Sequence, residues 1–286
     1  MSKLLLGLIG AGIQRSLAPA LQEEEARHHG LRLHYQLIDL DTAGVGTEAL
    51  PGLIAAARVM GFAGLNITYP CKQLVIPLLD GLSDEARAIG AVNTVVREGN
   101  RLIGHNTDGS GWSWGFRRAL PQADVSRVVL LGAGGAGSAC ADAALRIGAR
   151  ELRIVDRDHE RAKNLAERLN SNHGGQRCRA VADIATALVG ATGLIHATPT
   201  GMEKTPGMAA AENLLRPGLW ISEVVYVPLE PELLGAARRV GCKVMDGGHM
   251  NVGQALGAFR LFTGIDADAG RMDAHFRRLV AERVGG

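Results

Sequence analysis

The sequence predicts an α/β protein of two domains with mostly parallel strands. Three observations lead to this prediction. The chain has 286 residues, which is more than one hydrophobic core usually organises. Strand-like apolar runs alternate with helix-like runs along most of its length, as in proteins built from βαβ units. The pattern then starts again at Arg127, where a run of Val and Leu leads directly into a glycine-rich turn.

The first domain is expected to hold a sheet covered by helices. Gly30 closes a helix-like run, and Glu98-Gly99-Asn100 is typical of a hairpin turn. The strand-like runs are 4–10, 34–39, 64–68, 91–97 and 101–105. The helix-like runs are 19–30, 51–60, 71–79 and 83–89.

The second domain is expected to span residues 110–246. Its strand-like runs are 127–131, 151–156, 193–197 and 220–225, and its helix-like runs are an Ala-rich stretch to about Ile147 and 159–169. Two closing helices, 250–262 and 267–284, have no strand left to cover. We therefore assign residues 1–109 and 247–286 to the first domain, and we expect a cleft between the domains, where ligands often bind.

Composition excludes several classes of function. The chain has 31 Lys and Arg against 29 Asp and Glu, spread along its length, so neither nucleic acid nor a membrane surface is an expected partner. Its apolar N-terminal run reads as a strand and not as a signal peptide, and no run reaches the roughly 18 residues of a membrane helix, so we expect a cytoplasmic protein. The four cysteines form no C-x-x-C pair, so we expect no metal site.

The glycine-rich turn carries the strongest local signal. Gly132, Gly134 and Gly137 match G-x-G-x-x-G between a strand and a helix, with Gly135 and Ala136 inside the motif. The first glycine allows a tight turn, the second a close approach of a pyrophosphate, and the third close packing of helix on strand. This context predicts a Rossmann-type, doubly wound dinucleotide-binding domain. The alternative is a βα turn of the same shape that binds no nucleotide.

Asp156 ends the next strand-like run, 24 residues after Gly132. A carboxylate there accepts hydrogen bonds from the adenosine ribose and repels a 2′-phosphate, which favours NAD over NADP. Arg157 is able to pair with a 2′-phosphate, but it stands between two carboxylates. The second of these, Asp158, is better placed to cap the following helix.

Three segments in the first domain are unusually polar for strand ends. They are Asn66-Ile67-Thr68-Tyr69-Pro70-Cys71-Lys72, Gly90-Ala91-Val92-Asn93-Thr94 and Gly104-His105-Asn106-Thr107-Asp108-Gly109. Amides, hydroxyls, a Lys and an Asp at such positions suit a small polyhydroxylated molecule. Together with the glycine-rich turn and the segment Asp246-Gly247-Gly248-His249-Met250, these motifs resemble the shikimate dehydrogenase family, in order and across nearly the whole chain. The residues in and around these motifs are most similar to those of the NAD-dependent quinate/shikimate branch.

The resemblance implies a role for each matching residue. Lys72 would be the catalytic lysine and Asp108 its partner; a positioned Lys relays the proton as hydride leaves a ring alcohol. Ser16 would hold the substrate carboxylate. Ring hydroxyls would be held by Asn66, Thr68, Asn93 and Gln254, with Tyr226 at the cleft. The cofactor site would include Thr198, Met202, Val224 and Gly247. His105, His196 and His249 are expected to be structural or surface groups.

One departure from the family pattern concerns the substrate. The carboxylate loop of the family carries two hydroxyls, and here Ala18 stands in place of the second. Shikimate, quinate and an aminoshikimate-like analogue therefore stay open, as does the direction of the reaction. A weakly active homologue that senses a ligand is a further alternative, whereas another Rossmann enzyme such as a methylene-folate dehydrogenase is disfavoured by Asn93-Thr94 and Asn106-Thr107-Asp108-Gly109. The partner is a small hydroxy-carboxylate, and monomer and homodimer are both compatible with the sequence.

Overall fold

The computed structural model describes residues 3–284, and its chain forms two compact units. The first contains the residues up to 107 and those from 254 onward, and the second contains residues 108–253. The second boundary falls inside the helix α10 (Gly247–Thr263), seven residues beyond the position expected from the sequence. A continuous helix gives no local signal for the point at which one unit ends.

The first unit is built on a six-stranded mixed sheet in the order β2-β1-β3-β5-β6-β4. Strand β1 is parallel to both β2 and β3, whereas β5 is antiparallel to its neighbours β3 and β6. The short β4 pairs parallel to β6. The strands are β1 (Lys3–Gly10), β2 (Arg32–Asp39), β3 (Gly64–Ile67), β4 (Gly81–Leu82), β5 (Thr94–Glu98) and β6 (Arg101–His105).

Helices of the first unit begin with α1 (Ala18–His28) and end with α11 (Ala269–Val284). Between them lie α2 (Leu40–Ala43), η1 (Thr47–Ala49), α3 (Leu50–Met60), η2 (Ile76–Leu78) and α4 (Asp84–Ile89). The helix expected over 71–79 is wrong, because the segment consists of turns followed by the single 3-10 turn η2. Pro77 explains this, since it has no N–H to donate to the preceding turn.

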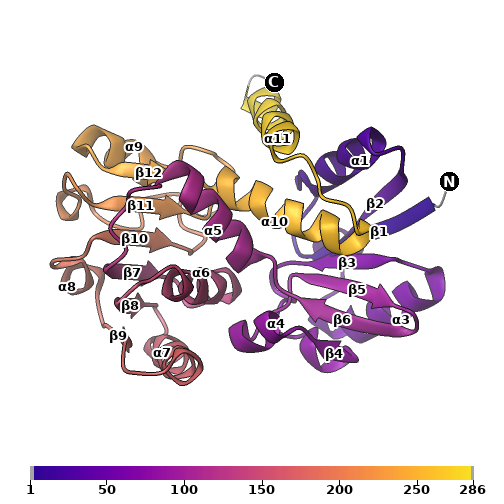
Figure 1. The fold of residues 1–286 in the computed structure, drawn as a ribbon, viewed down its shortest axis with the longest axis horizontal. Helices are drawn as coiled ribbons and strands as arrows, with labels where there is room; N and C mark the ends of the chain where they lie inside the picture. The colour runs from indigo at the N-terminus through magenta and orange to yellow at the C-terminus, as the bar shows by residue number, and fades with distance from the viewer. Residues whose placement is uncertain (1–2, 285–286) are drawn as a thin grey trace. The chain divides into compact units, whose positions relative to one another are not determined.

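A parallel six-stranded sheet forms the second unit, in the order β12-β11-β10-β7-β8-β9. Figure 1 shows these strands side by side, from β12 at the top of the sheet to β9 at the bottom. From β7 the chain continues to β8 on one side of the sheet and later to β10 on the other side. The carboxyl ends of β7 and β10 are therefore the switch point of a doubly wound sheet. The strands are β7 (Arg127–Leu131), β8 (Glu151–Val155), β9 (Cys178–Ala180), β10 (Gly193–His196), β11 (Trp220–Glu223) and β12 (Lys243–Met245). The predicted Rossmann-type fold is confirmed.

The core of the second unit lies on both faces of this sheet. Val128, Val129 and Leu130 on β7 are at most 1% exposed. Trp112 stacks on Phe116 at a centroid distance of 4.9 Å, and both belong to the buried cluster that includes Val128 and Leu130. The helices are α5 (Asp108–Ala119), α6 (Gly135–Arg146), α7 (His159–His173), α8 (Ile184–Leu188), η3 (Glu212–Leu214) and α9 (Glu232–Val240). Over residues 3–284, no helix is long and apolar enough to cross a membrane.

Candidate active site

The glycine-rich turn has the geometry that its motif predicts. Gly132 has φ +103°, which a residue with a side chain rarely adopts. A Cβ added at Gly137 would lie 1.9 Å from the carbonyl oxygen of Gly132. The first glycine therefore makes the turn from β7 possible, and the third allows α6 to start against it.

Gly134 differs from the other two glycines. Its backbone is extended at φ −76° and ψ −170°, and among the described residues a Cβ would meet no atom within 4 Å. Neither conformation nor protein packing requires glycine here. Gly134 is also the N-cap of α6, where no side-chain cap is formed, so Gly135 and Ala136 begin the helix with N–H groups available to an anion. The turn therefore fits a dinucleotide pyrophosphate lying against Gly134.

Asp156 connects the end of β8 to this turn. One carboxylate oxygen accepts from Ala133 N–H at 2.7 Å, and the other accepts from Asp158 N–H at 2.9 Å. Arg157 is exposed beside it. Asp158 accepts from Arg161 N–H and caps α7, as the sequence predicted. The carboxylate of Asp156 thus stands at the place expected for a ribose-binding acid and keeps lone pairs for further donors.

Three more predicted cofactor residues lie at the carboxyl edge of the same sheet. The methyl of Thr198 would lie 2.9 Å from a Cβ at Gly132. Val224 N–H donates to His196 O at 3.0 Å, and a Cβ at Gly247 would lie 2.7 Å from Val224 O. Met202 sits farther out, 42% exposed in the turn after β10. Ligands of doubly wound folds bind at this edge.

In the first unit, Asn66 and Asn93 belong to one buried hydrogen-bond network. Asn66 Nδ2 donates to Asn93 O at 3.1 Å and to Thr94 Oγ1 at 3.0 Å. Thr94 Oγ1 donates to Asn93 Oδ1 at 2.9 Å, which also accepts from Thr107 N–H at 2.8 Å. The network joins the ends of β3, β5 and β6. Tyr35, which the sequence analysis missed, adds a fourth strand by donating to Asn66 Oδ1 at 2.7 Å.

Backbone bonds bring the remaining polar segments of this unit to the same edge. Thr68 N–H donates to Ile9 O at 2.9 Å, and Val92 N–H donates to Lys72 O at 2.8 Å. Lys72 is thereby held next to the segment that contains Asn93. Lys72 and Thr68 are both partly exposed, whereas Asn66 and Asn93 are at least 92% buried. The unit thus combines two buried asparagine side chains with a partly exposed lysine on a neighbouring segment.

The loop that carries Ser16 is anchored by Asp39, another residue that the sequence analysis missed. Its carboxylate accepts from Gly12 N–H at 2.9 Å and Ile13 N–H at 3.0 Å. Burial alone raises the pKa of Asp39, but the bonds from the Gln14 side chain and from three backbone N–H groups outweigh burial and hold the pKa below its usual value. Ser16 Oγ itself accepts from Ala18 N–H at 3.2 Å.

The other predicted site residues are divided between the units. Asp108 is the first residue of α5 and is 4% exposed. Tyr226 follows β11 and is partly exposed, and both belong to the second unit. Gln254 is partly exposed on α10 and belongs to the first unit, as does Lys72. The pairing of Lys72 with Asp108 stays a prediction.

Two of the histidines lie against carboxylates, and the four cysteines are buried. His196 is fully buried against Glu223, and His249 Nδ1 lies 3.0 Å from Asp246. The four cysteines are buried thiols, and burial raises the pKa of Cys178 to about 11. Within residues 3–284, no group of three or more His, Cys, Asp or Glu side chains is arranged to hold a metal ion.

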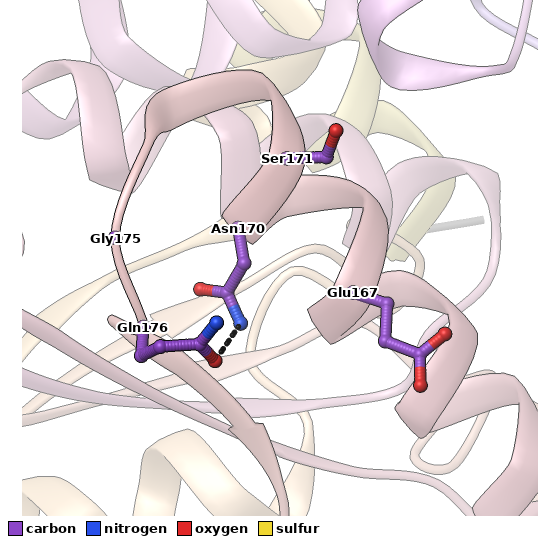
Figure 2. Close-up of a pocket in the computed structure, with 5 residues that line it drawn as sticks. All are labelled: Glu167, Asn170, Ser171, Gly175 and Gln176. Carbon is purple, nitrogen blue, oxygen red and sulfur yellow. Dashed lines mark hydrogen bonds between the residues drawn. The ribbon is translucent and has the colours of Figure 1, made fainter.

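An open hollow of about 370 Å³ lies elsewhere, beside the end of α7, and Figure 2 shows the residues that line it. In its lining, Asn170 Nδ2 donates to Gln176 Oε1 at 3.4 Å. Asn170 also makes two bonds of 2.9 Å to the backbone of Cys178. These contacts tie α7 to β9. None of the predicted site residues lies in this hollow.

Two family models match separate parts of the chain. The model of the shikimate dehydrogenase substrate binding domain matches residues 8–95, and the model of shikimate / quinate 5-dehydrogenase matches residues 116–202. A shikimate dehydrogenase (NADP(+)) of Streptomyces avermitilis is 55% identical over 96% of this chain and 96% of its own. The chain belongs to the shikimate dehydrogenase family. The family predicted from the sequence motifs is thereby confirmed.

Other members of the family differ in the cofactor that they are named for. A quinate/shikimate dehydrogenase (NAD(+)) of Corynebacterium efficiens is 43% identical over 96% of this chain and 98% of its own. The solved quinate dehydrogenase from Corynebacterium glutamicum, in complex with NAD, superposes with a TM-score of 0.90 at 42% identity over 97% of this chain and 100% of that chain. The protein is thus an oxidoreductase of a family that uses both NAD and NADP.

Proposed function

We propose that the protein is an NAD-dependent dehydrogenase that interconverts shikimate, and also quinate, with the 3-dehydro ketone. The observation that supports NAD most directly is Asp156. Its carboxylate accepts hydrogen bonds from Ala133 N–H and Asp158 N–H at the end of β8, next to the glycine turn on which the dinucleotide would lie. A 2′-phosphate there would meet a fixed negative charge.

The neighbours of Asp156 do not build a phosphate site. Arg157 is exposed, and the carboxylates of Asp156 and Asp158 flank it in sequence. Asp158 also stays in place, because it caps α7. Relatives named for NADP and for NAD are both similar to this chain, so the choice rests on these three residues.

The first unit would hold the ring of the substrate. Asn66, Thr68 and Asn93 present amides and a hydroxyl near the place where β3 and β5 meet. The network around Thr94 orients the two asparagine side chains. Gln254 would add another amide and Tyr226 a phenol. Ser16 would bind the carboxylate, on a loop that Asp39 holds in place. Groups fixed in this way lose little entropy when they bind a ligand.

In the proposed reaction, Lys72 and Asp108 handle the proton of the alcohol. The Lys72 amine would hydrogen-bond the reacting oxygen and relay its proton towards water as the C–H bond breaks. Asp108 would orient Lys72 and an adjacent ring hydroxyl. The nicotinamide, when bound, accepts the hydride. The contribution of the protein is geometry and a stable charge beside the developing alkoxide.

Ala18 supports a second candidate substrate. Ser16 Oγ accepts from Ala18 N–H, and the side chain of Ala18 adds no hydroxyl. One missing bond to a charged group lowers affinity by about 1.5–3 kcal/mol if nothing replaces it. The loop therefore leaves an aminoshikimate-like analogue open as the substrate.

Initial rates of nicotinamide reduction test the proposal, with shikimate and quinate each supplied with NAD and with NADP. We expect turnover with NAD, and we expect Lys72→Ala and Asp108→Ala to lose it while the protein stays folded. Lys163→Ala, which removes an exposed lysine of α7, is the matched control and should be fully active. Retained turnover in both site variants would disprove the mechanism. Tight binding of a ring acid without turnover would favour a ligand sensor.

A further inference from the structure

A buried chain of polar groups in the second unit ends at Thr198. Glu223 ends β11 and His196 ends β10, directly opposite each other in the parallel register. Both residues are fully buried. His196 Nδ1 lies 2.9 and 2.8 Å from the carboxylate oxygens of Glu223, and its Nε2 lies 2.5 Å from Thr198 Oγ1. The proposed reaction assigns no role to His196 or Glu223.

Stability is a weak explanation for such a pair. Removing an acid and an imidazole from water costs free energy that their attraction only partly returns, and an apolar pair of similar volume is often at least as stable. Apolar residues do occupy other buried positions of these two strands, because Ile195 and Ile221 are both fully buried. We therefore infer a role beyond packing for His196 and Glu223.

The bonds around Glu223 decide how the imidazole is oriented. Glu223 Oε1 also accepts from Val224 N–H and Val225 N–H, both at 2.9 Å. Since the groups that face Nδ1 are acceptors, we assign the ring hydrogen to Nδ1. In this assignment Nε2 carries no hydrogen, so it accepts the hydroxyl hydrogen of Thr198. Thr198 Oγ1 thus presents lone pairs to other groups, as in its 3.3 Å contact with Thr200 N–H.

Thr198 stands beside the dinucleotide turn. Its Cγ2 would lie 2.9 Å from a Cβ at Gly132, and Ala197 N–H donates to Leu131 O at 2.8 Å. The polar chain therefore crosses from β11 through β10 to the first glycine of the motif. A change in the hydrogen bonding of Glu223 reaches Thr198 through one imidazole ring.

We propose that His196 and Glu223 are positioning residues that fix the Thr198 hydroxyl as a hydrogen-bond acceptor for a donor group of the dinucleotide. A carboxamide N–H or a ribose O–H has the required chemistry. The inference rests on the proposed function, because it concerns the same dinucleotide site. Neither His196 nor Glu223 would touch the cofactor.

Glu223→Gln tests this polarity. The amide oxygen still serves Val224 N–H and Val225 N–H, but the NH₂ group now faces His196 Nδ1. An NH₂ donor 2.8 Å from Nδ1 favours the tautomer with the ring hydrogen on Nε2, where it points at Thr198 and turns the hydroxyl hydrogen outward. We expect the Kd for NAD, measured by calorimetric titration without substrate, to rise about tenfold, as for one lost hydrogen bond.

A double-mutant cycle separates positioning from general damage. Thr198→Val removes the hydroxyl and should raise the Kd as much as Glu223→Gln does. The double variant should bind no more weakly than Thr198→Val alone, because the acceptor is already gone. Ser222→Ala is the matched control on β11: it deletes the 2.9 Å bond from Trp112 Nε1, and it should lower the Tm without changing the Kd.

Two results would overturn the inference. One is an unchanged Kd in Glu223→Gln, and the other is a double variant weakened about a hundredfold, which is the product of two independent defects. Should Glu223→Gln not fold, Thr198→Ser and Thr198→Val decide the matter, since equal affinity in these two contradicts a role for the hydroxyl. A wild-type protein that binds neither NAD nor NADP would instead refute the proposed function, and this inference would fall with it.

Discussion

Gly134→Ala separates the folding of the second unit from its binding of a dinucleotide. The backbone at Gly134 is extended, and among the described residues no atom lies within 4 Å of an added Cβ. Alanine adopts this conformation without strain, and it restricts the unfolded chain more than glycine does. That restriction would stabilise the free protein by about 0.4–1 kcal/mol, but alanine is a poorer N-cap than glycine and offsets the gain, so the net change in stability should stay below about 1 kcal/mol. The Tm should therefore stay within about 4 °C of the wild-type value.

The same methyl group should harm binding. It would occupy the space through which a pyrophosphate approaches the start of α6 and would push the phosphate away from the helix N–H groups. One lost hydrogen bond to a charged group costs about 1.5–3 kcal/mol. The Kd for NAD should therefore rise about 10- to 100-fold.

Thermal unfolding and calorimetric titration measure the two effects on the same sample. Gly137→Ala is the contrasting variant, because its Cβ would lie 1.9 Å from Gly132 O and no side-chain rotation relieves that contact. This variant should lose about 1–3 kcal/mol or more of stability as well as affinity. A Gly134→Ala protein that binds NAD like the wild type would refute the placement of the pyrophosphate. A Tm lowered as far as that of Gly137→Ala would refute the account of the Gly134 backbone.

Three further predictions address the cofactor, the substrate unit and acid stability. Asp156→Asn removes the charge that would repel a 2′-phosphate. In steady-state assays, the ratio of kcat/KM for NADP to kcat/KM for NAD should rise about tenfold or more. An unchanged ratio would mean that Asp156 does not select the cofactor. Tyr35→Phe leaves Asn66 Oδ1 without its 2.7 Å donor, so the free energy of unfolding measured by urea titration should fall by about 1–3 kcal/mol. The KM for the ring substrate should rise, while the KM for NAD should not change. A rise in the KM for NAD instead would contradict the assignment of Asn66. The folded-state pKa of Asp39 is below its usual value, so its contribution to stability is present above the unfolded pKa and disappears as pH falls through the folded pKa. Asp39→Asn should flatten the loss of stability between about pH 5 and pH 2 in urea titrations, and an unchanged slope would show that the loop bonds are not formed in solution.

Much of the fold was predictable because its signals are local. The glycine turn, the Asp158 cap and the longer strands each depend on residues that are adjacent in sequence. Several missed elements, such as β4, β9 and α8, have only two to five residues, which are too few to show a period. The nine-residue helix α9 was missed as well. The predicted helix over 71–79 failed where Pro77 weighed against an apolar pattern.

The sequence by itself determined the βαβ order, the dinucleotide turn and the polar segments at the strand ends, because backbone conformation and apolar periodicity are properties of neighbouring residues. Only the tertiary structure decided which distant side chains support them. Tyr35 reaches Asn66 because β1 lies between β2 and β3, and His196 faces Glu223 because β10 and β11 are neighbours in register. Strand order depends on how the whole chain packs, and a hydrogen bond between residues 27 or 31 positions apart leaves no mark in the sequence around either one.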